Sequence, residues 1–555
     1  MRVWRNVLTY DERSFEMHMT RFVTALCAVL LPALVGWAEK SYRLDDFPSI
    51  SAAIAACAEK GGGRVVVGRG EHRSDGPVVL RSNVELHLEE GATVVFSDRL
   101  EDYLPGVRVA WEGIECVNVS PLVYACGCTN VAITGRGTLK AKMDFWWTWA
   151  GARKPDCEVV NRKLKNEWSP KNVPVDERQL WKEPNARFRP QFLHFNRCKD
   201  VRLEGFSVRG TPFWTVHVFL CDGVTARNLD VDATGDDGRM INNSDGFDID
   251  ATRNVLVEGC TFCQGDDAIV LKSGKDFDGR RLATPTENVV VRNCTVRKGH
   301  NLAAIGSELS GGVRNVRISG CRIAGAVGEL LHIKTNPRRG GFVENVVIED
   351  VEVEGLKADV LGITSRYYFG GPGEEAFERD FLTPIRNVVL RDIRCRWAAR
   401  RLNLRGDYLL PVENVSLSNV RIASCKSPDY VASVRNLSVD GLPVSPTIRV
   451  LTAADLNGVD VSAAIYQPES RDSVLAFTDG TVKGTVVRAS RDLKTWSEPV
   501  AELWPEDEFG SAEVKSAKIR NETDGWYMDV DFASGRRTYY TPEVFWPFKP
   551  KSCFK

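Results

Sequence analysis

The feature that most constrains this sequence is a short phrase that recurs from about Asn130 to Val439. It reads Asn-Val-x-apolar-x-x-apolar-x-apolar, and its clearest copies are NVLVEGCTF at 254, NVVVRNCTV at 288, NVRISGCRI at 315, NVVIEDVEV at 345, NVVLRDIRC at 387 and NVSLSNVRI at 414. Looser copies begin at Asp200 and Gly223. Apolar residues that alternate over so short a span predict β-strands with one buried face. Recurrence every 22 to 42 residues or so indicates stacked units, each too small to bury its own face.

These strands predict an all-β fold, a right-handed parallel β-helix (solenoid) over residues 41–444. In such a stack, like residues lie above one another, so Cys260, Cys294 and Cys321 are expected to share one column. The repeated asparagine is predicted to be a turn residue in a stack of amide side chains. Leucine-rich and propeller repeats are the alternatives, but the chain has neither the LxxLxL spacing nor a Trp-Asp signature.

Three other segments complete the predicted organisation. Residues 47–60 read as an N-terminal helix that caps the open end of the stack. Between Lys140 and Phe192 the repeat lapses into a long insertion rich in Trp, Pro and charge, which is expected to lie over one face as functional loops do. Residues 446–555 are predicted to form a small C-terminal β-rich accessory domain, whose role can be carbohydrate binding or simple stabilisation.

The first 38 residues are predicted to be a signal peptide, with Met19 as an alternative start. The stretch from Phe22 to Ala38 is almost wholly apolar and offers small residues at the cleavage positions. A membrane anchor is the alternative, but the run is shorter than the ~20 residues that a spanning helix requires. We therefore expect a secreted or periplasmic protein. A formal net charge of −1 argues against nucleic acid or membrane as a partner.

The sequence contains 15 cysteines, one of them (Cys27) inside the predicted signal. An exported chain can carry many disulfides, but a domain of this size does not need them. Most of the cysteines occupy repeat positions, where a thiol behaves as a small buried apolar group. Few disulfides are therefore expected.

Four short motifs fall on consecutive predicted coils: Asn243-Ser244-Asp245-Gly246, Gly265-Asp266-Asp267, Gly299-His300 and His332-Ile333-Lys334. The intervals from Asp245 to Asp266, then to His300, then to Lys334 are 21, 34 and 34 residues, about one coil each. Asp266 and His300 each follow the asparagine of their own repeat by 12 residues. Equal offsets in a solenoid mean neighbouring positions, so the spacing predicts one surface patch with an aspartate cluster, a histidine and a lysine.

Such a patch fits glycosidic cleavage, which requires one carboxylic acid to protonate the departing oxygen and a carboxylate to activate water or attack carbon. Ionised aspartates this close would repel one another, which raises one pKa and keeps a proton available. The alternative is that the aspartates are turn residues or calcium ligands. Lys334 is expected to bind a substrate carboxylate, and Lys272, Arg338 and Arg339 to add a local basic field.

The segments NSDGFDID, QGDDAIVLKSG, GHNLAAIGSELSGGVRNV and HIKTNPRRGG, in this order between Ala52 and Val444, resemble glycoside hydrolase family 28, the polygalacturonase family. The resemblance implies hydrolysis of α-linked galacturonan with inversion and without a metal or other cofactor. It implies Asp266 as the general acid, Asp245 and Asp267 as the residues that activate water, and His300 as support for the acid. It also implies Lys334 and Tyr367, or its neighbour Tyr368, as substrate-binding residues. Lys272, from the local basic field, and His332 complete the predicted substrate-binding set. The insertion is similar to that of bacterial members that trim chain ends, so a monomeric, exo-acting enzyme on pectic polysaccharide or oligosaccharide is expected.

The sequence departs from the family in having His332 where an arginine is usual, which removes a bidentate fork for a carboxylate. Ser244 stands where threonine is common. Trp146, Trp147, Trp149 and Trp214 are candidates for sugar stacking or for closing one end of the groove. Three other functions stay open: a hydrolase of rhamnose- or xylose-bearing pectin, a calcium-dependent pectate lyase, and a non-catalytic glycan-binding protein.

Overall fold

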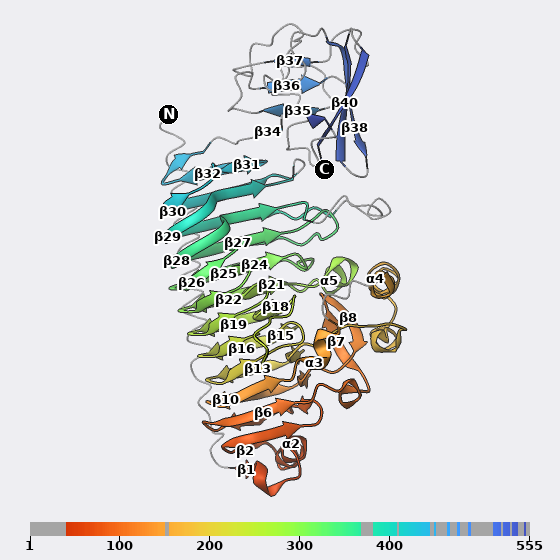
Figure 1. The fold of residues 1–555 in the computed structure, drawn as a ribbon, viewed down its shortest axis with the longest axis vertical. Helices are drawn as coiled ribbons and strands as arrows, with labels where there is room; N and C mark the ends of the chain where they lie inside the picture. Colours follow the sequence, from red (N-terminus) through yellow and green to blue (C-terminus); the bar gives the residue numbers. More distant parts are fainter. Residues whose placement is uncertain are drawn as a thin grey trace.

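The computed structural model describes residues 40–149, 155–367, 381–407 and 410–444, together with the backbone of short strands between 449 and 550. The predicted signal peptide and Tyr368 lie outside the described residues. From residue 41 to residue 443 the chain winds into stacked coils, and Figure 1 shows their strands lying one above another. The predicted right-handed parallel β-helix is confirmed.

Each full coil contributes strands to three parallel sheets. The first sheet carries the repeated phrase and contains β1 (Ser41–Arg43), β2 (Gly63–Val67), β5 (Val84–Leu88), β10 (Thr129–Gly135), β13 (Lys199–Glu204), β16 (Asp222–Arg227), β19 (Arg253–Glu258), β22 (Thr286–Arg292), β25 (Val313–Ser319), β28 (Val343–Thr364), β29 (Ile385–Arg405), β30 (Val412–Cys425) and β32 (Val434–Val439). β33 (Leu442–Pro443) closes it as an antiparallel partner of β32.

The second sheet contains β3 (Gly70–Ser74), β6 (Ala92–Phe96), β11 (Thr138–Ala141), β14 (Ser207–Arg209), β17 (Asp230–Asp232), β20 (Thr261–Cys263), β23 (Thr295–Lys298), β26 (Arg322–Val327) and later parts of the long strands β28 to β30. The third contains β4 (Val78–Val79), β9 (Val123–Cys126), β12 (Leu193–Asn196), β15 (Val216–Phe219), β18 (Phe247–Asp250), β21 (Ile269–Lys272), β24 (Asn301–Gly306), β27 (Glu329–Lys334), the ends of β28 and β29, and β31 (Tyr430–Ala432). This third sheet carries the motifs.

The repeated asparagines form the predicted amide ladder. Each adopts a left-handed backbone conformation, with φ between 54° and 60° at the positions from Asn254 to Asn436 in the repeat. Their side chains are joined coil to coil: Asn288 Nδ2 donates to Asn254 Oδ1 at 3.1 Å, and Asn315 Nδ2 donates to Asn288 Oδ1 at 3.2 Å. Asparagine tolerates this conformation and satisfies its amide on both sides, which explains why the sequence repeats it.

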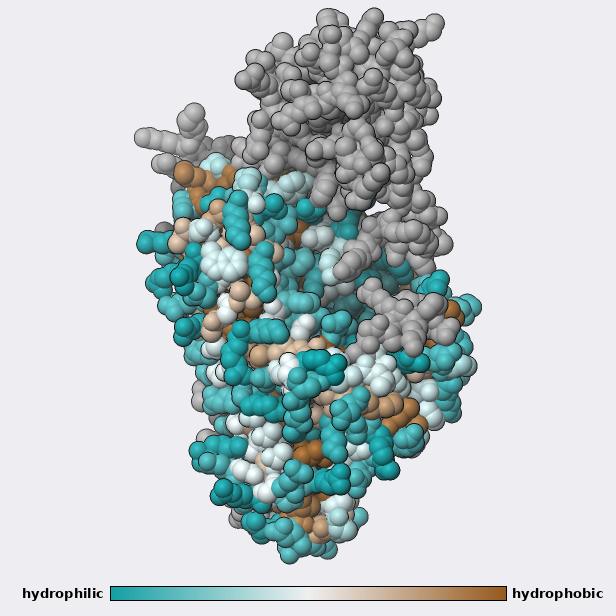
Figure 2. Space-filling view, in the orientation of Figure 1, coloured by the Kyte–Doolittle hydropathy of each residue, from teal (hydrophilic) through white to brown (hydrophobic). Residues whose placement is uncertain are grey.

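The core lies inside the stack, where one face of each strand is buried. Val255, Val289 and Val316, which pair across the first sheet, are each fully buried. Cys260, Cys294 and Cys321 are buried in one column, and the twelve cysteines whose side chains the structure describes are free thiols, in agreement with the expectation of few disulfides. On the outer face in Figure 2, apolar side chains lie in small groups among hydrophilic ones, so most apolar surface is used inside the coils.

Helix α2 (Ile50–Glu59) begins at the N-cap Ser49, whose Oγ accepts a hydrogen bond from the N–H of Ala52 at 3.1 Å. It buries Ile50 and Ile54 against the core. This confirms the predicted helix. The other short helical segments are η2 (Leu44–Asp46), η3 (Leu100–Tyr103), α3 (Asp144–Trp147), α4 (Pro155–Lys163), η4 (Leu164–Trp168), η5 (Val175–Glu177), η6 (Leu180–Lys182) and α5 (Asp276–Leu282). Among the described residues, no helix combines the length and the apolar character that crossing a bilayer requires.

Outside the parallel coils, the described strands pair in antiparallel fashion, in one hairpin and in two sheets near the C-terminus. An antiparallel hairpin of β7 (Val107–Trp111) and β8 (Ile114–Asn118), which the repeat did not predict, lies beside α4 in Figure 1. Near the C-terminus, the described strands form two antiparallel sheets: β34 (Arg449–Val450), β35 (Ala463–Tyr466), β36 (Val474–Phe477) and β37 (Val487–Ala489); and β38 (Val514–Glu522), β39 (Gly525–Phe532), β40 (Gly535–Thr541) and β41 (Lys549–Pro550). The domain boundaries given above stay predictions.

Candidate active site

The third sheet brings the four motifs together. Asp245 precedes β18, Asp266 and Asp267 precede β21, His300 precedes β24, and Lys334 ends β27. Backbone hydrogen bonds hold these coils in register: the N–H of Gly246 donates to Asp267 O at 2.9 Å, and the N–H of His300 donates to Asp266 O at 2.8 Å. The equal offsets in the sequence therefore correspond to adjacent rungs of one sheet.

Two glycines allow the aspartate turns to pack closely. A Cβ on Gly246 would lie 2.5 Å from Ala268 O, and a Cβ on Gly265 would lie 2.6 Å from Ser244 Oγ. Ser244 Oγ accepts from the N–H of Gly265 at 3.0 Å and donates to Ile241 O at 2.6 Å, so it joins the two aspartate-bearing turns. Only glycine permits this approach, which fixes the relative positions of Asp245 and Asp266.

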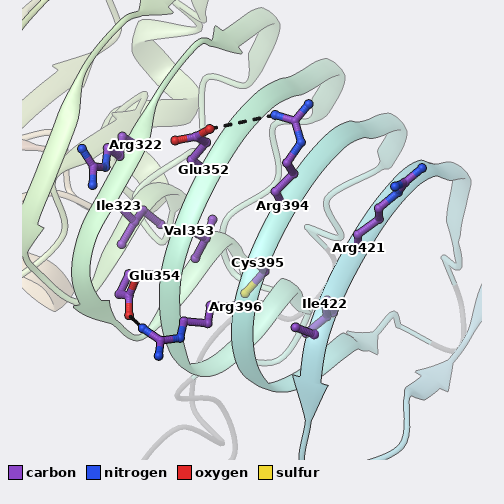
Figure 3. A pocket seen from close by; sticks show the side chains of 11 residues that line it. Arg322, Ile323, Glu352, Val353, Glu354, Arg394, Cys395, Arg396, Arg421 and Ile422 are labelled. Atoms are coloured by element: carbon purple, nitrogen blue, oxygen red, sulfur yellow. Dashed lines mark hydrogen bonds and ion pairs between the residues drawn. The ribbon is translucent and has the colours of Figure 1, made fainter.

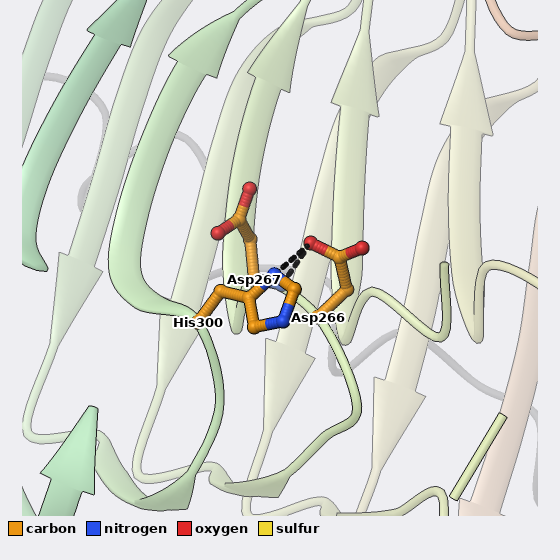
Figure 4. Close-up of side chains that lie close together, drawn as sticks. All are labelled: Asp266, Asp267 and His300. Atoms are coloured by element: carbon orange, nitrogen blue, oxygen red, sulfur yellow. Dashed lines mark hydrogen bonds and ion pairs between the residues drawn. The ribbon is translucent and has the colours of Figure 1, made fainter. Parts of the chain in front are cut away.

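Asp266 and Asp267 face different partners. His300 Nδ1 lies 3.0 Å from Asp266 Oδ1, and the three side chains of Asp266, Asp267 and His300 converge in Figure 4. Asp267 is almost fully buried and accepts from Asn301 Nδ2 at 2.6 Å and from Lys334 Nζ at 2.9 Å. Asp266 is the more open of the two, with 17% of its side chain exposed.

The pKa values of the aspartates are shifted in opposite directions, and the raised value is not that of Asp266, the expected general acid. Burial, with the nearby charges of Asp266 and Asp248, raises the pKa of Asp245 well above its ordinary value, and Asp245 Oδ1 has no hydrogen-bond partner among the described residues. Burial also acts to raise the pKa of Asp266, but the hydrogen bond and charge of His300 outweigh it, so the pKa of Asp266 is lowered. The Asp266 bond in turn raises the pKa of His300. Without substrate, these shifts favour the protonated form of Asp245 and of His300 and disfavour that of Asp266.

A buried charge network lies beside the cluster. Lys272 Nζ and Lys275 Nζ each donate to the Glu308 carboxylate at 3.1 Å, and both Lys275 and Lys165 contact Glu112 at 3.1 Å. Lys272, predicted to bind substrate, lines the cavity and is paired there with Glu308 at 3.1 Å; its role in substrate binding stays a prediction. Buried cations need such partners.

The arginines of the predicted basic field are likewise engaged. Arg338 and Arg339 both pair with Asp276, which is buried at the start of α5. They line the same cavity as the aspartates, where both guanidinium groups contact the single carboxylate of Asp276. The sequence predicted the basic residues Arg338 and Arg339, but it did not predict that both pair with Asp276.

His332 and Tyr367 lie on the next rungs. The His332 ring packs edge-on against Tyr367 with 5.9 Å between centroids, and its Nδ1 is 3.4 Å from Glu329 Oε1. Tyr367 lines the cavity with Lys334, whose Nζ is 5.6 Å from the tyrosine ring. Glu329 was not predicted from the sequence; its only signal there is its position three residues before His332.

One cavity of about 1360 Å³ is lined by the three aspartates together with His300, Glu329, His332, Lys334 and Tyr367. The insertion supplies part of its wall, including Trp149, Lys165 and Arg189, and the hairpin supplies Trp111 and Glu112. Trp111 stacks on Phe213 at 4.3 Å between ring centroids, within an apolar cluster that joins hairpin and insertion. The prediction that the insertion lies over a functional face is borne out by these lining residues.

The predicted tryptophans have different positions. Trp149 and Trp214 line the cavity. Trp146 is fully buried and packs on Tyr103, so it is a core residue and cannot stack on a sugar. Trp147 lies under Arg239, whose guanidinium is 4.2 Å from the ring centroid.

The acidic cluster is a weak match for a calcium site. Ligand atoms of Asp266, Asp267 and His300 lie within 4.8 Å of one another. Calcium takes six to eight oxygen ligands, whereas this set has two carboxylates and an imidazole. The Lys334 ammonium at 2.9 Å from Asp267 already occupies the position of a counter-cation.

A second hollow, of about 490 Å³, lies over β26, β28, β29 and β30 (Figure 3). Arginines and glutamates rim a floor that includes Ile323 and Val353, and Glu354 pairs with Arg396 at 2.6 Å. Its acidic lining residues are Glu352 and Glu354, and none of the four sequence motifs contributes to it.

A parallel β-helix with carboxyl groups, an imidazole and an ammonium converging in one open cavity defines an enzyme of the polysaccharide-cleaving class. The sequence model of glycosyl hydrolases family 28 matches residues 175–440. The exopolygalacturonase structure from Thermotoga maritima is 33% identical, covers 73% of this chain and 92% of that one, and superimposes with a TM-score of 0.64. The chain belongs to glycosyl hydrolases family 28 and is a glycoside hydrolase.

Two more distant relatives, one a solved structure and one a sequence, are also similar to this chain. The family 28 exopolygalacturonase of Yersinia enterocolitica is 21% identical, with coverage of 73% and 79% and a TM-score of 0.57. The protein named "Probable polygalacturonase" from Vitis vinifera is 23% identical over 379 residues, which are 66% of this chain and 68% of that protein.

Proposed function

We propose that this enzyme hydrolyses α-linked galacturonic acid chains of pectin by general acid/base catalysis with inversion. The observation that carries the proposal is the position of Lys334 Nζ, 2.9 Å from Asp267 and in the same cavity as Asp245 and Asp266. A buried ammonium beside the reacting carboxyl groups suits a substrate that carries a carboxylate near the cleaved bond. The 33% identity to the Thermotoga maritima exopolygalacturonase supports the same substrate class.

We assign Asp266 as the acid, with Asp245 and Asp267 holding the attacking water. Asp266 is the aspartate with the larger exposed fraction, 17%, so a sugar can cover it. Covering it removes water, which favours its protonated form. His300, 3.0 Å away and with a raised pKa, is the nearest source of that proton.

Exo-action is supported by the residues of the insertion and the hairpin that line the cavity. The insertion is tied to the stack through Asp278, which accepts from Ser169 Oγ at 2.9 Å and pairs with buried Arg178. The cavity lining also includes Trp111, Trp214 and the Lys165–Glu112 pair. We propose that this wall limits the cavity to a chain end, so that the enzyme is exo-acting.

The first test is Asp266→Asn, which preserves shape and removes the acid. We expect hydrolysis of oligogalacturonates to fall by about 10²–10⁴-fold, the usual contribution of a general acid, with an unchanged melting temperature. Asp46→Asn, at an exposed aspartate near the N-terminal cap, is the matched control and should keep full activity. Normal hydrolysis by a folded Asp266→Asn protein would refute the assignment.

We further propose that the enzyme is exported to the periplasm or the medium and acts there as a monomer, without nucleic acid or membrane partners. The apolar segment from Phe22 to Ala38 supports export. Fractionation of cells that express the full chain, followed by light scattering of the purified enzyme, tests both statements.

A further inference from the structure

One buried cation of the cavity, Arg189, has no carboxylate partner in the described part of the chain. Most lysines and arginines that line the cavity lie within 3.3 Å of a carboxylate oxygen: Lys165, Lys272, Lys275, Lys334, Arg338 and Arg339. Arg187, Arg189 and Lys357 have no such partner among the described residues. Of these three, Arg189 alone is buried, with 7% of its surface exposed.

The Arg189 guanidinium is held by neutral groups and keeps one edge free. Its Nη1 donates to Pro212 O at 2.7 Å and to Asn242 O at 2.8 Å, and its Nη2 lies 3.4 Å from Asn243 Oδ1. Its Cζ is 5.3 Å from the centroid of the Phe213 ring. Nε and the second hydrogen of Nη2 have no acceptor among the described residues. Nε and Nη2 form one edge of the guanidinium, and such an edge binds a carboxylate bidentately.

The nearby carboxyl groups leave the charge of Arg189 largely uncompensated. Burial lowers the pKa of Arg189 to about 10, against the effect of Glu112 and Asp245, so the guanidinium is still charged at neutral pH. Glu112 is shared by Lys165 and Lys275, each at 3.1 Å. Burial raises the pKa of Asp245 well above its ordinary value, which favours its neutral form. A buried cation without an anion is costly, and a bound anion removes that cost.

Arg189 lies on the insertion side of the aspartates. It precedes β12, and its carbonyl acceptors lie in the turns before β15 and β18, the second of which carries Asp245. Lys334 lies at the end of β27, beyond β21 and β24 in the order of the third sheet. The two cations are therefore on opposite sides of Asp266 along the stack. A glycan cleaved at Asp266 directs one sugar unit towards each of them.

We propose that Arg189 binds the carboxylate of the sugar unit on the insertion side of the cleaved bond, so that the enzyme recognises one carboxylate on each side of that bond. Lys334 binds the other. This inference rests on the proposed hydrolysis of galacturonic acid chains and deepens it, because it requires uronic acid at two consecutive units. It also gives the insertion between Lys140 and Phe192, to which Arg189 belongs, a role in substrate selection.

The test uses trigalacturonate and analogues in which one unit at a time is replaced by galactose, whose hydroxymethyl group carries no charge. The products identify the cleaved bond and therefore the two units that flank it. For the wild type, we expect kcat/KM to fall at least about tenfold when either flanking carboxylate is removed, the loss of a hydrogen bond between charged groups.

Variants of Arg189 separate binding from a structural role. Arg189→Met keeps the length of the side chain and removes its charge, so kcat/KM for trigalacturonate should fall at least about tenfold. In this variant the loss of one flanking carboxylate should cost less than about twofold more, whereas the loss of the other should still cost about tenfold. Arg189→Lys keeps the charge and should stay sensitive to both. Arg322→Met, at an exposed arginine of the second hollow, is the matched control and should behave as the wild type.

The outcomes distinguish the two proposals. A purely structural role for Arg189 would lower the activity of Arg189→Met on every analogue by the same factor, and that result overturns the inference. A wild-type enzyme that needs a carboxylate on only one side of the cleaved bond also overturns it and leaves the proposed function intact; this comparison is decisive if Arg189→Met fails to fold. A folded wild-type enzyme that cleaves neither trigalacturonate nor its analogues refutes the proposed function, and the inference with it.

Discussion

Glu308 is the carboxylate that compensates the charges of two buried lysines, Lys272 and Lys275, beside the active site. It is 7% exposed and accepts hydrogen bonds from both Lys272 Nζ and Lys275 Nζ at 3.1 Å. The Glu308→Gln variant keeps the shape and removes the charge. Lys275 is then left with Glu112 at 3.1 Å, a carboxylate that it shares with Lys165, and Lys272 is left with the more distant Asp248 at 3.9 Å.

The expected loss follows from the cost of an uncompensated buried charge. Removing one partner of a buried pair costs about 3–5 kcal/mol. For the roughly 400 residues of the stack, an unfolding entropy of about 2.1 cal/mol/K per residue gives about 0.8 kcal/mol per degree, so the melting temperature should fall by about 4–6 °C.

Differential scanning calorimetry measures this shift, with two further variants for comparison. Glu354→Gln removes an exposed glutamate whose partner Arg396 is also exposed, and it should change the melting temperature by less than about 1 °C. Glu308→Gln combined with Lys272→Met removes one of the two cations and should recover part of the loss. A Glu308→Gln protein that melts within about 1 °C of the wild type would refute the view that this network stabilises the cavity wall.

Three more predictions concern the ladder and the site. Asn315→Ala loses amide bonds to Asn288 and Asn345 and forces alanine to φ 56°, so it should lower the free energy of unfolding in urea by about 2–3 kcal/mol, and Asn315→Gly should cost less. Because the pKa of His300 lies above 6.5, kcat/KM should be full below that pH and fall as pH rises through the raised pKa; His300→Asn should lack this limb of the pH profile. Lys334→Ala should raise KM for uronic oligosaccharides far more than for neutral glycosides, and equal effects would count against a carboxylate-binding role.

The strands, the amide ladder and the neighbouring positions of the site residues could be predicted from the sequence, because these features repeat from coil to coil. The asparagine phrase predicted the strands, the coil and the amide ladder, because each copy must repeat the same turn and the same buried face. The offset of 12 residues from Asn254 to Asp266 and from Asn288 to His300 placed the acid and the imidazole on neighbouring rungs for the same reason.

What the sequence could not predict depends on contacts between distant, unrepeated segments. Glu112 and Lys275 are 163 residues apart and meet only because the β7–β8 hairpin folds over the third sheet. The location of the protons could not be predicted either. Whether Asp245 or Asp266 has the raised pKa depends on burial and on His300, and adjacent aspartates in a sequence carry neither piece of information.

The most direct test of the central claim is product analysis on galacturonate oligomers, with and without a chelator, following reducing ends and ultraviolet absorbance together. The account predicts that a chelator leaves the release of saturated galacturonate unchanged, with monomer or dimer as the only early product. Unsaturated products that require calcium would contradict it and make the enzyme a lyase.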